Sequence, residues 1–96
     1  MRRESVIELL AAHKEVLSER FDVTALAVFG STARDTACSG SDVDLLVSFN
    51  GPATSGRYFG LQFYLEDLLG CPVDLITNKA LRPELRSYVE KDAIYV

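Results

Sequence analysis

Three short apolar runs divide the chain, and the first two end in residues that favour turns. They are VTALAVF at 23–29, VDLLVSF at 43–49 and CPVDLIT at 71–77. Each run is short and rich in apolar and β-branched residues, as buried strands are. We therefore expect these three segments to form a small sheet.

Helical periodicity marks the segments around these runs. Apolar side chains recur at helical spacing in residues 3–20 and again in residues 57–69. Gly70 suits the position after a helix C-terminus, and Pro83 suits the first turn of a last helix over 83–91. This order of elements favours an α/β (α+β) fold, in which helices flank a small mixed sheet. The remaining predictions are a Ser5–Glu8 capping box, a short helix at 32–34 and a short strand at 93–96.

Length and charge limit the classes of protein that this chain can represent. Its 96 residues predict one domain over 1–96. The formal net charge of -4 at pH 7 argues against a protein that grips long nucleic acid. No apolar run approaches the ~20 residues that span a bilayer, so we expect no membrane segment and a cytoplasmic location. Cys38 and Cys71 are too few for a disulfide framework and are expected to be reduced thiols.

Two aspartates open the second predicted strand. Because side chains alternate along a strand, Asp42 and Asp44 project from the same face. Such carboxylates repel one another, and a hard divalent cation such as Mg²⁺ relieves the repulsion. Asp74 interrupts the third apolar run, where a lone carboxylate is costly unless it is exposed or paired. If the third strand lies beside the second, the three carboxylates form a site for one or two metal ions.

A candidate phosphate site precedes these carboxylates. Gly30 and Ser31 follow the first strand and precede a predicted helix start, where backbone N–H groups attract phosphate. Glycine allows the backbone to approach a ligand, and the serine hydroxyl adds a hydrogen bond. Arg34 offers a guanidinium fork to phosphate oxygens about one turn further on. A phosphate cradle beside a metal site is the combination that transfer at phosphorus needs.

The spacing of these residues matches a known family. Gly30-Ser31, ten residues and then Asp42-Val43-Asp44 resemble the signature of the DNA polymerase β-like nucleotidyltransferase superfamily. The sequences GSTAR at 30–34 and SDVDLLV at 41–47 resemble its minimal branch in particular. The resemblance extends over nearly the whole chain and implies the polymerase β-like fold. The other segments that carry it are 65–70, 73–77, 81–85 and 92–96.

The resemblance implies a role for each carboxylate. Asp42, Asp44 and Asp74 would be catalytic residues and ligands for one or two Mg²⁺ ions. Asp74 would be the third carboxylate and a possible base for the incoming hydroxyl. The usual nucleotide donor of the family is ATP.

The resemblance also assigns the upstream residues. Gly30 and Ser31 would bind the triphosphate, and Arg34 occupies the family's arginine position. The chain departs from the family at Asp35, where glycine is common. This aspartate adds negative charge close to the phosphate cradle.

Members of the minimal branch are commonly antitoxins of HEPN/MNT toxin–antitoxin pairs, of the MntA type. The resemblance therefore implies transfer of AMP to a tyrosine of a partner HEPN-class RNase toxin, within a hetero-oligomer. Two alternatives stay open. One is an antitoxin that neutralises its partner by steric cover, with vestigial aspartates. The other is a small-molecule nucleotidyltransferase, but larger enzymes of that kind bring a second domain for which this chain has no room.

Other reactive or aromatic residues are expected to have structural roles. His13 is in line with the apolar side chains of the first helix and is expected to pack there. Cys38 is expected to lie in a loop and to have no functional role. The aromatic residues of the helix at 57–69 are expected to lie partly in the core and partly at a protein interface, where tyrosine is favoured. They are Tyr58, Phe59, Phe63 and Tyr64.

Overall fold

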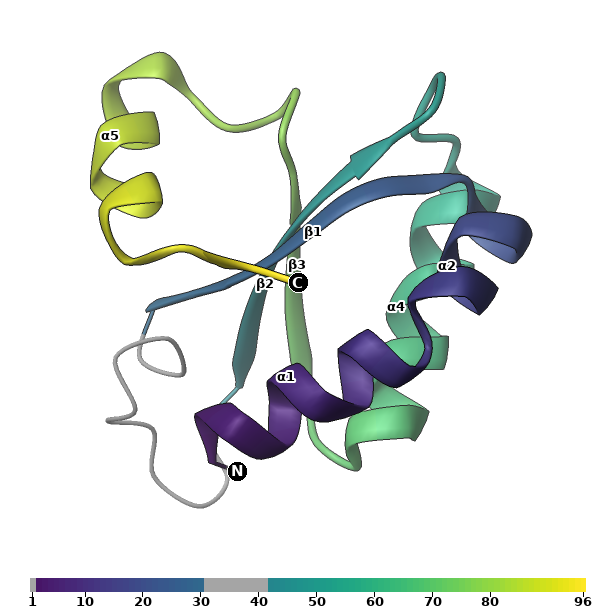
Figure 1. Ribbon diagram of the computed structural model, residues 1–96. Coiled ribbons are helices and arrows are strands. Elements are labelled where there is room, and N and C mark those ends of the chain that lie inside the picture. Colours follow the sequence, from purple (N-terminus) through teal and green to yellow (C-terminus); the bar gives the residue numbers. More distant parts are fainter. Residues whose placement is uncertain (1, 31–41) are drawn as a thin grey trace.

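The computed structural model describes residues 2–30 and 42–96 (Figure 1). The three apolar runs form three strands, with helices before the first strand and on both sides of the third, so the predicted α/β fold is confirmed. The short helix predicted at 32–34 lies outside the described residues. The elements are α1 (Arg3–Ala12), α2 (Lys14–Phe21), β1 (Val23–Phe29), β2 (Val43–Phe49), α4 (Ser55–Leu69), β3 (Val73–Thr77), α5 (Pro83–Asp92) and β4 (Ile94–Tyr95).

The four strands form one mixed sheet in the order β3-β2-β1-β4. Strand β1 is antiparallel to both β2 and β4, whereas β2 and β3 are parallel. A parallel pair needs a long crossover, and α4 supplies it between β2 and β3. The predicted mixed sheet is therefore confirmed, with β3 at one edge.

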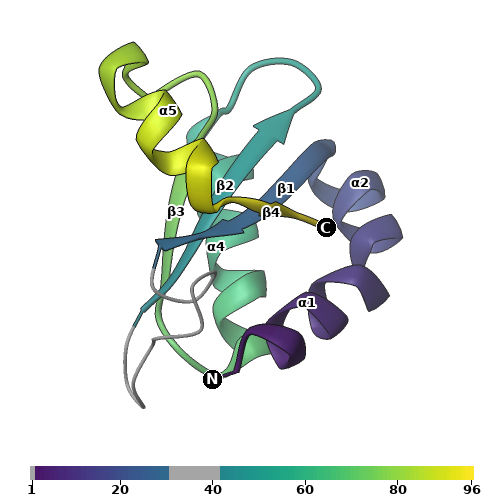
Figure 2. The same ribbon diagram turned by 60° about the vertical axis from the view of Figure 1, so that its left-hand side comes forward.

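Helices cover both faces of the sheet, but unequally (Figure 2). The larger core lies between one face and helices α1, α2 and α4, and the smaller core lies between the other face and α5. Alternation along the strands produces this division, because odd-numbered residues of β2 face the larger core and Leu46 faces the smaller one. The largest fully buried side chains are Leu10, Leu17, Leu45, Leu61, Leu65, Val6, Val28, Val43 and Val47.

The first helix predicted over 3–20 is two helices, because the chain changes direction at His13 (Figure 1). The backbone of His13 leaves the helical region, with φ -106° and ψ 9°. Its Nδ1 atom forms a 2.8 Å hydrogen bond with the hydroxyl of Tyr64 on α4. Leu10 and Leu17, on either side of the break, are both fully buried. Packing against α4 and the sheet therefore divides the one long helix that the apolar periodicity predicted.

The helix ends agree with the sequence in two places and differ in one. Gly70 ends α4 with φ +71°, and Pro83 lies in the first turn of α5, as predicted. The Ser5–Glu8 capping box is wrong, because α1 begins at Arg3 and places Ser5 inside its first turn. Arg2 is the N-cap, and its side chain makes no capping hydrogen bond.

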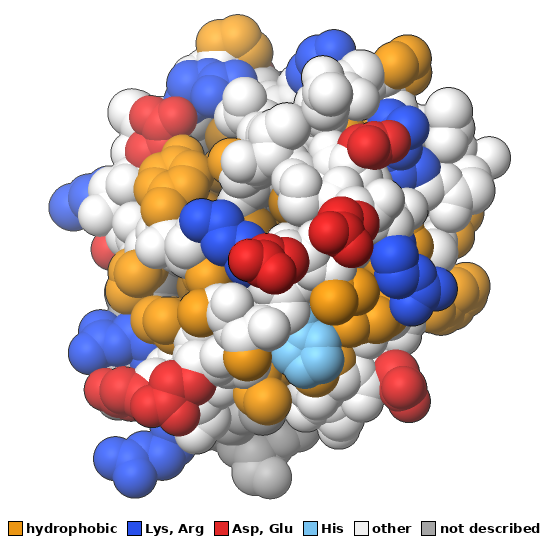
Figure 3. All heavy atoms as spheres, turned by 45° about the vertical axis from the view of Figure 1, so that its right-hand side comes forward, with side chains coloured by type: hydrophobic (Ala, Val, Ile, Leu, Met, Phe, Trp, Pro, Cys, Tyr) orange, Lys and Arg blue, Asp and Glu red, His pale blue; other side chains and the backbone are white. Residues whose placement is uncertain are grey.

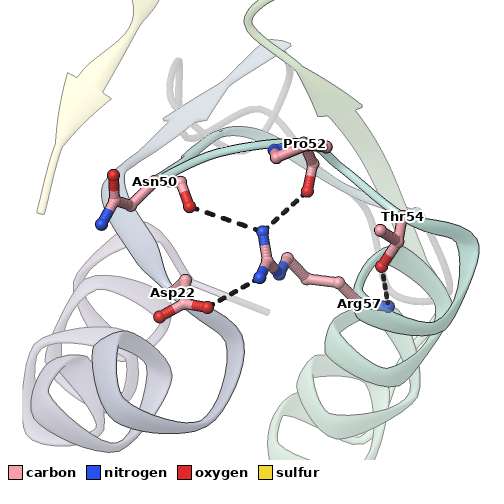
Figure 4. A network of polar contacts seen from close by, with 5 residues as sticks. All are labelled: Asp22, Asn50, Pro52, Thr54 and Arg57. Carbon is pink, nitrogen blue, oxygen red and sulfur yellow. Dashed lines mark hydrogen bonds and ion pairs between the residues drawn. The ribbon is translucent and has the colours of Figure 1, made fainter.

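Arg57 fastens the start of α4 to the rest of the domain (Figure 4). Its backbone N–H donates to the Thr54 hydroxyl, which caps the helix. Its guanidinium donates to the carbonyl oxygens of Asn50 and Pro52, at 3.5 and 2.7 Å. It also pairs with the carboxylate of Asp22 at 2.7 Å. One side chain thus joins the end of α2, the β2–α4 connection and the first turn of α4.

The face that carries α2 and α4 shows acidic and basic side chains interspersed with small hydrophobic areas (Figure 3). A mixed surface of this kind differs from the single-sign basic stripe of proteins that follow a nucleic-acid backbone. In the ranges 2–30 and 42–96, the helices are too short or too polar to cross a bilayer.

The buried face of α4 offers a direct test of the larger core. We expect Leu61→Ala to lower the free energy of unfolding by about 2–5 kcal/mol, because Leu61 is fully buried and the change leaves a cavity. Leu85→Ala is the matched control, since Leu85 is 48% exposed on α5, and it should change the value by less than about 0.5 kcal/mol. Urea denaturation would measure both, and equal losses would contradict the described core.

Candidate functional site

The register of β2 and β3 places Asp44 directly opposite Asp74. Residues opposed on parallel strands point to the same face of the sheet. The side chains that flank these two aspartates, such as Leu45 and Leu75, are buried in the larger core. Both carboxylates therefore project from the other face, the one that carries α5. Asp44 is half-buried there and Asp74 is exposed.

Asp42 lies just before β2 and is exposed. The neighbouring Val43 N–H donates to the Pro72 carbonyl oxygen at 3.0 Å, which joins the starts of β2 and β3. Within the described ranges, no three side chains of His, Cys, Asp or Glu stand together as a ready metal site. The sheet thus brings Asp44 and Asp74 together, and metal ligation by all three aspartates stays a prediction.

Gly30 lies against the carboxylate of Asp44 at the end of β1. The register opposes Phe29 to Asp44, so the next residue passes beside that side chain. A Cβ atom on Gly30 would lie 2.3 Å from Asp44 Oδ2, closer than any real contact. Its φ of +68° also favours glycine over every other residue. Two independent constraints therefore require glycine at this point. The other sequence-predicted residues of this segment, Ser31, Arg34, Asp35 and Cys38, lie outside the described residues.

Tyr58 was not predicted to belong to the site, but its hydroxyl donates to the carbonyl oxygen of Leu75, one residue beyond Asp74. Burial raises the pKa of Tyr58 above its ordinary value, and the negative charge of Asp74 raises it further. The hydroxyl therefore stays protonated at neutral pH and serves as a donor. No sequence motif distinguishes this residue. An aromatic residue on an amphipathic helix is ordinarily expected to pack in the core.

Cys71 packs against the larger core and is partly exposed. Burial is the main cause that raises the pKa of its thiol, and the charges of Asp42 and Glu66 raise it further. The thiol is therefore mostly protonated at neutral pH and weakly nucleophilic. The negative charge of Asp42 contributes to this raised pKa, and a protonated thiol is a poor nucleophile.

The aromatic residues of α4 divide as expected. Tyr58 and Tyr64 are half-buried against the larger core, whereas Phe59 and Phe63 are 52% and 66% exposed. His13 is half-buried and bonded to Tyr64, so its structural role is confirmed.

Three comparisons relate this chain to known proteins. The family model described as the nucleotidyltransferase domain matches residues 10–96. The protein adenylyltransferase MntA of Thermococcus cleftensis is 40% identical over 93 residues, which cover 97% of this chain and 94% of that protein. A solved structure described as a minimal nucleotidyltransferase superposes with a TM-score of 0.78 at 37% identity, over 98% of this chain and 95% of the other.

A more distant structure shares the fold. It is the complex of a tri-AMPylated Shewanella oneidensis HEPN toxin with an MNT antitoxin. The TM-score is 0.61 at 18% identity, over 97% of this chain and 66% of the matched chain.

The raised pKa of Cys71 predicts slow alkylation. In a Cys38→Ser background, iodoacetamide should modify Cys71 more slowly than a free thiol at about pH 8, because only the thiolate reacts. As the pH is raised, the alkylation rate of Cys71 should still increase at a pH where the rate of a free thiol has become constant. Asp42→Asn removes a negative charge, lowers the pKa and should speed the reaction, whereas Asp67→Asn on the exposed side of α4 should not. Mass spectrometry would follow the rates, and an unchanged rate in Asp42→Asn would contradict the described environment.

Proposed function

Because the chain belongs to the nucleotidyltransferase domain family, we propose that it is a protein adenylyltransferase and the antitoxin of a HEPN-type toxin. One observation carries the proposal: Asp44 and Asp74 lie side by side on β2 and β3, with Gly30 against Asp44. The similarity to MntA, a protein adenylyltransferase, supports adenylyl transfer to a protein. The shared fold with an MNT antitoxin is consistent with a HEPN-type partner.

The donor set fits Mg²⁺. Carboxylate oxygens are the hard ligands that Mg²⁺ prefers, and it typically takes one or two of them together with substrate phosphates. Asp44 and Asp74 present such oxygens on neighbouring strands, and Asp42 adds a third carboxylate two residues before Asp44. One or two ions bound there would neutralise charge on the triphosphate.

The proposed reaction joins the acceptor oxygen of a toxin tyrosine to the α-phosphorus of ATP and breaks the bond to the leaving pyrophosphate. The hydroxyl loses its proton, and the exposed Asp74 is the proposed acceptor of that proton. Gly30 leaves room for the triphosphate beside the backbone, and Ser31 and Arg34 are proposed to bind it. Positioning and charge neutralisation of this kind account for most of the catalysis at phosphorus.

The protein partner is proposed to supply the acceptor surface. Phe59 and Phe63 lie one turn apart on α4 and are more than half exposed, and aromatic side chains are enriched at protein interfaces. We propose that residues 1–96 act as one cytoplasmic domain in a hetero-oligomer with the toxin. The net charge of -4 argues against long nucleic acid as a ligand.

Intact-mass spectrometry tests the enzyme. A HEPN-type toxin from the same genome is incubated with this protein, ATP and Mg²⁺, and we expect it to gain one or more AMP units. The Asp42→Asn, Asp44→Asn double variant should lose at least about a hundredfold in rate, because both proposed metal ligands are weakened. Asp67→Asn makes the same chemical change at an exposed position and should keep full activity.

The exposed pair on α4 also favours a second candidate function, neutralisation by steric cover alone. The same double variant separates the two. Neutralisation lost while the complex still forms supports catalysis. Neutralisation kept in full, with no AMP gained by the toxin in the presence of the native protein, supports steric cover.

Gly30 and Gly70 both have a positive φ, so Gly70 provides a matched control for a substitution at Gly30. Gly30→Ala and Gly70→Ala both force alanine into a left-handed conformation, and this backbone effect alone should cost each variant about 1–2 kcal/mol of stability. Only Gly30→Ala pushes a methyl group into the Asp44 carboxylate, since nothing lies near a Cβ atom at Gly70. We therefore expect Gly30→Ala alone to weaken the binding of Mg²⁺ and ATP, as measured by calorimetry. Equal affinities in the two variants would show that Asp44 and Gly30 are not part of the nucleotide site.

A further inference from the structure

Strand β3 is at the edge of the sheet, and half of its backbone groups point away from β2. In a parallel ladder, alternate residues of a strand bond to the same neighbour. The Pro72 carbonyl oxygen and the Asn78 N–H both bond to β2. The intervening residues of the other parity, Val73 and Leu75, therefore direct their backbone groups outward.

Helix α4 meets this outer edge with three polar side chains. Tyr58, Gln62 and Glu66 are spaced four residues apart and lie on one side of the helix. The Tyr58 hydroxyl donates to the Leu75 carbonyl oxygen. Gln62 Nε2 donates to the Val73 carbonyl oxygen at 3.2 Å.

Glu66 completes the row. Its Oε2 atom accepts the Val73 N–H at 3.0 Å, a hydrogen bond strengthened by the charge of the carboxylate. The side chains of α4 thus provide, at three points, the hydrogen bonds that a fifth strand would have made.

These hydrogen bonds bracket Asp74. Its two chain neighbours, Val73 and Leu75, are bonded outward to α4, while their side chains are buried in the larger core. Asp74 itself projects from the opposite face, beside Asp44. An edge strand is paired with the sheet on one side only, and hydrogen bonds to α4 on both sides of Asp74 restrict its movement relative to β2.

We propose that Tyr58, Gln62 and Glu66 are positioning residues that hold Asp74 at the distance from Asp44 that the transfer reaction needs. The inference rests on the role of Asp74 in the proposed function. Small errors in the position of a reacting group are costly, since a misplacement of about 1 Å can reduce a rate about a hundredfold. Without these hydrogen bonds, the edge strand β3 would be free to move by such a distance.

The test combines backbone protection with ligand binding. Hydrogen exchange followed by mass spectrometry reports the amides of residues 73–77, and the electron paramagnetic resonance signal of free Mn²⁺ reports the binding of Mn²⁺ with ATP. We expect Tyr58→Phe and Glu66→Leu to speed exchange in β3 and to weaken Mn²⁺·ATP binding about threefold to tenfold, as the loss of one hydrogen bond predicts. Glu66→Gln keeps an acceptor oxygen and should restore most of the affinity.

Tyr64→Phe is the matched control for Tyr58→Phe, because it removes a hydroxyl of the same helix that bonds to His13 and not to β3. It should leave both measurements unchanged. In an Asp74→Asn background, Tyr58→Phe should no longer affect Mn²⁺·ATP binding, since the residue acts only through Asp74.

Two results would overturn the inference and leave the proposed function intact. One is faster exchange in β3 with an unchanged Mn²⁺·ATP affinity, which would make the contacts purely structural. The other is an equal loss of affinity with and without the Asp74 carboxylate. If Asp74→Asn alone binds Mn²⁺·ATP as tightly as the native protein, the role of Asp74 in the proposed function is wrong, and the inference is overturned with it.

Discussion

Burial of apolar side chains on one face of β2 and β3 keeps two like charges together on the other. Leu45 and Leu75 are packed against the helices of the larger core, and this packing specifies the register of the parallel pair. A slip of one residue would turn the apolar side chains to solvent and the carboxylates into the core, at a cost far above any electrostatic gain. The hydrophobic effect thus provides the energy that holds Asp44 beside Asp74, and the site depends on a core that it does not touch.

Helix α4 contacts both the larger core and the strand that carries Asp74. Its buried side chains complete the larger core, and Arg57 in its first turn holds the β2–α4 connection and the end of α2. Further along the helix, Tyr58 and Glu66 reach the strand that carries Asp74. The crossover that a parallel pair requires for topological reasons therefore also supports the candidate site.

Local sequence patterns predicted the features that depend on local physics. The strands follow from apolar runs, and the ends of α4 and α5 follow from Gly70 and Pro83, whose backbone preferences act within a few residues. The break at His13 was not predictable from local sequence, because the residue contacts Tyr64 on a helix far along the chain. The candidate site divides in the same way. The motif identified Asp44 and Asp74 as neighbours once the strands pair, whereas the contacts of Tyr58 depend on how a helix packs across a sheet edge.

The row of side chains along β3 also bears on how the protein behaves at high concentration. An exposed strand edge is a template on which another chain can add a strand, and such addition leads to aggregation. On β3, hydrogen bonds with Tyr58, Gln62 and Glu66 already occupy the outward groups of Val73 and the Leu75 carbonyl. An incoming strand would have to displace them before it could bond. Side-chain capping of this edge therefore protects the domain against sheet extension at the strand that bears Asp74.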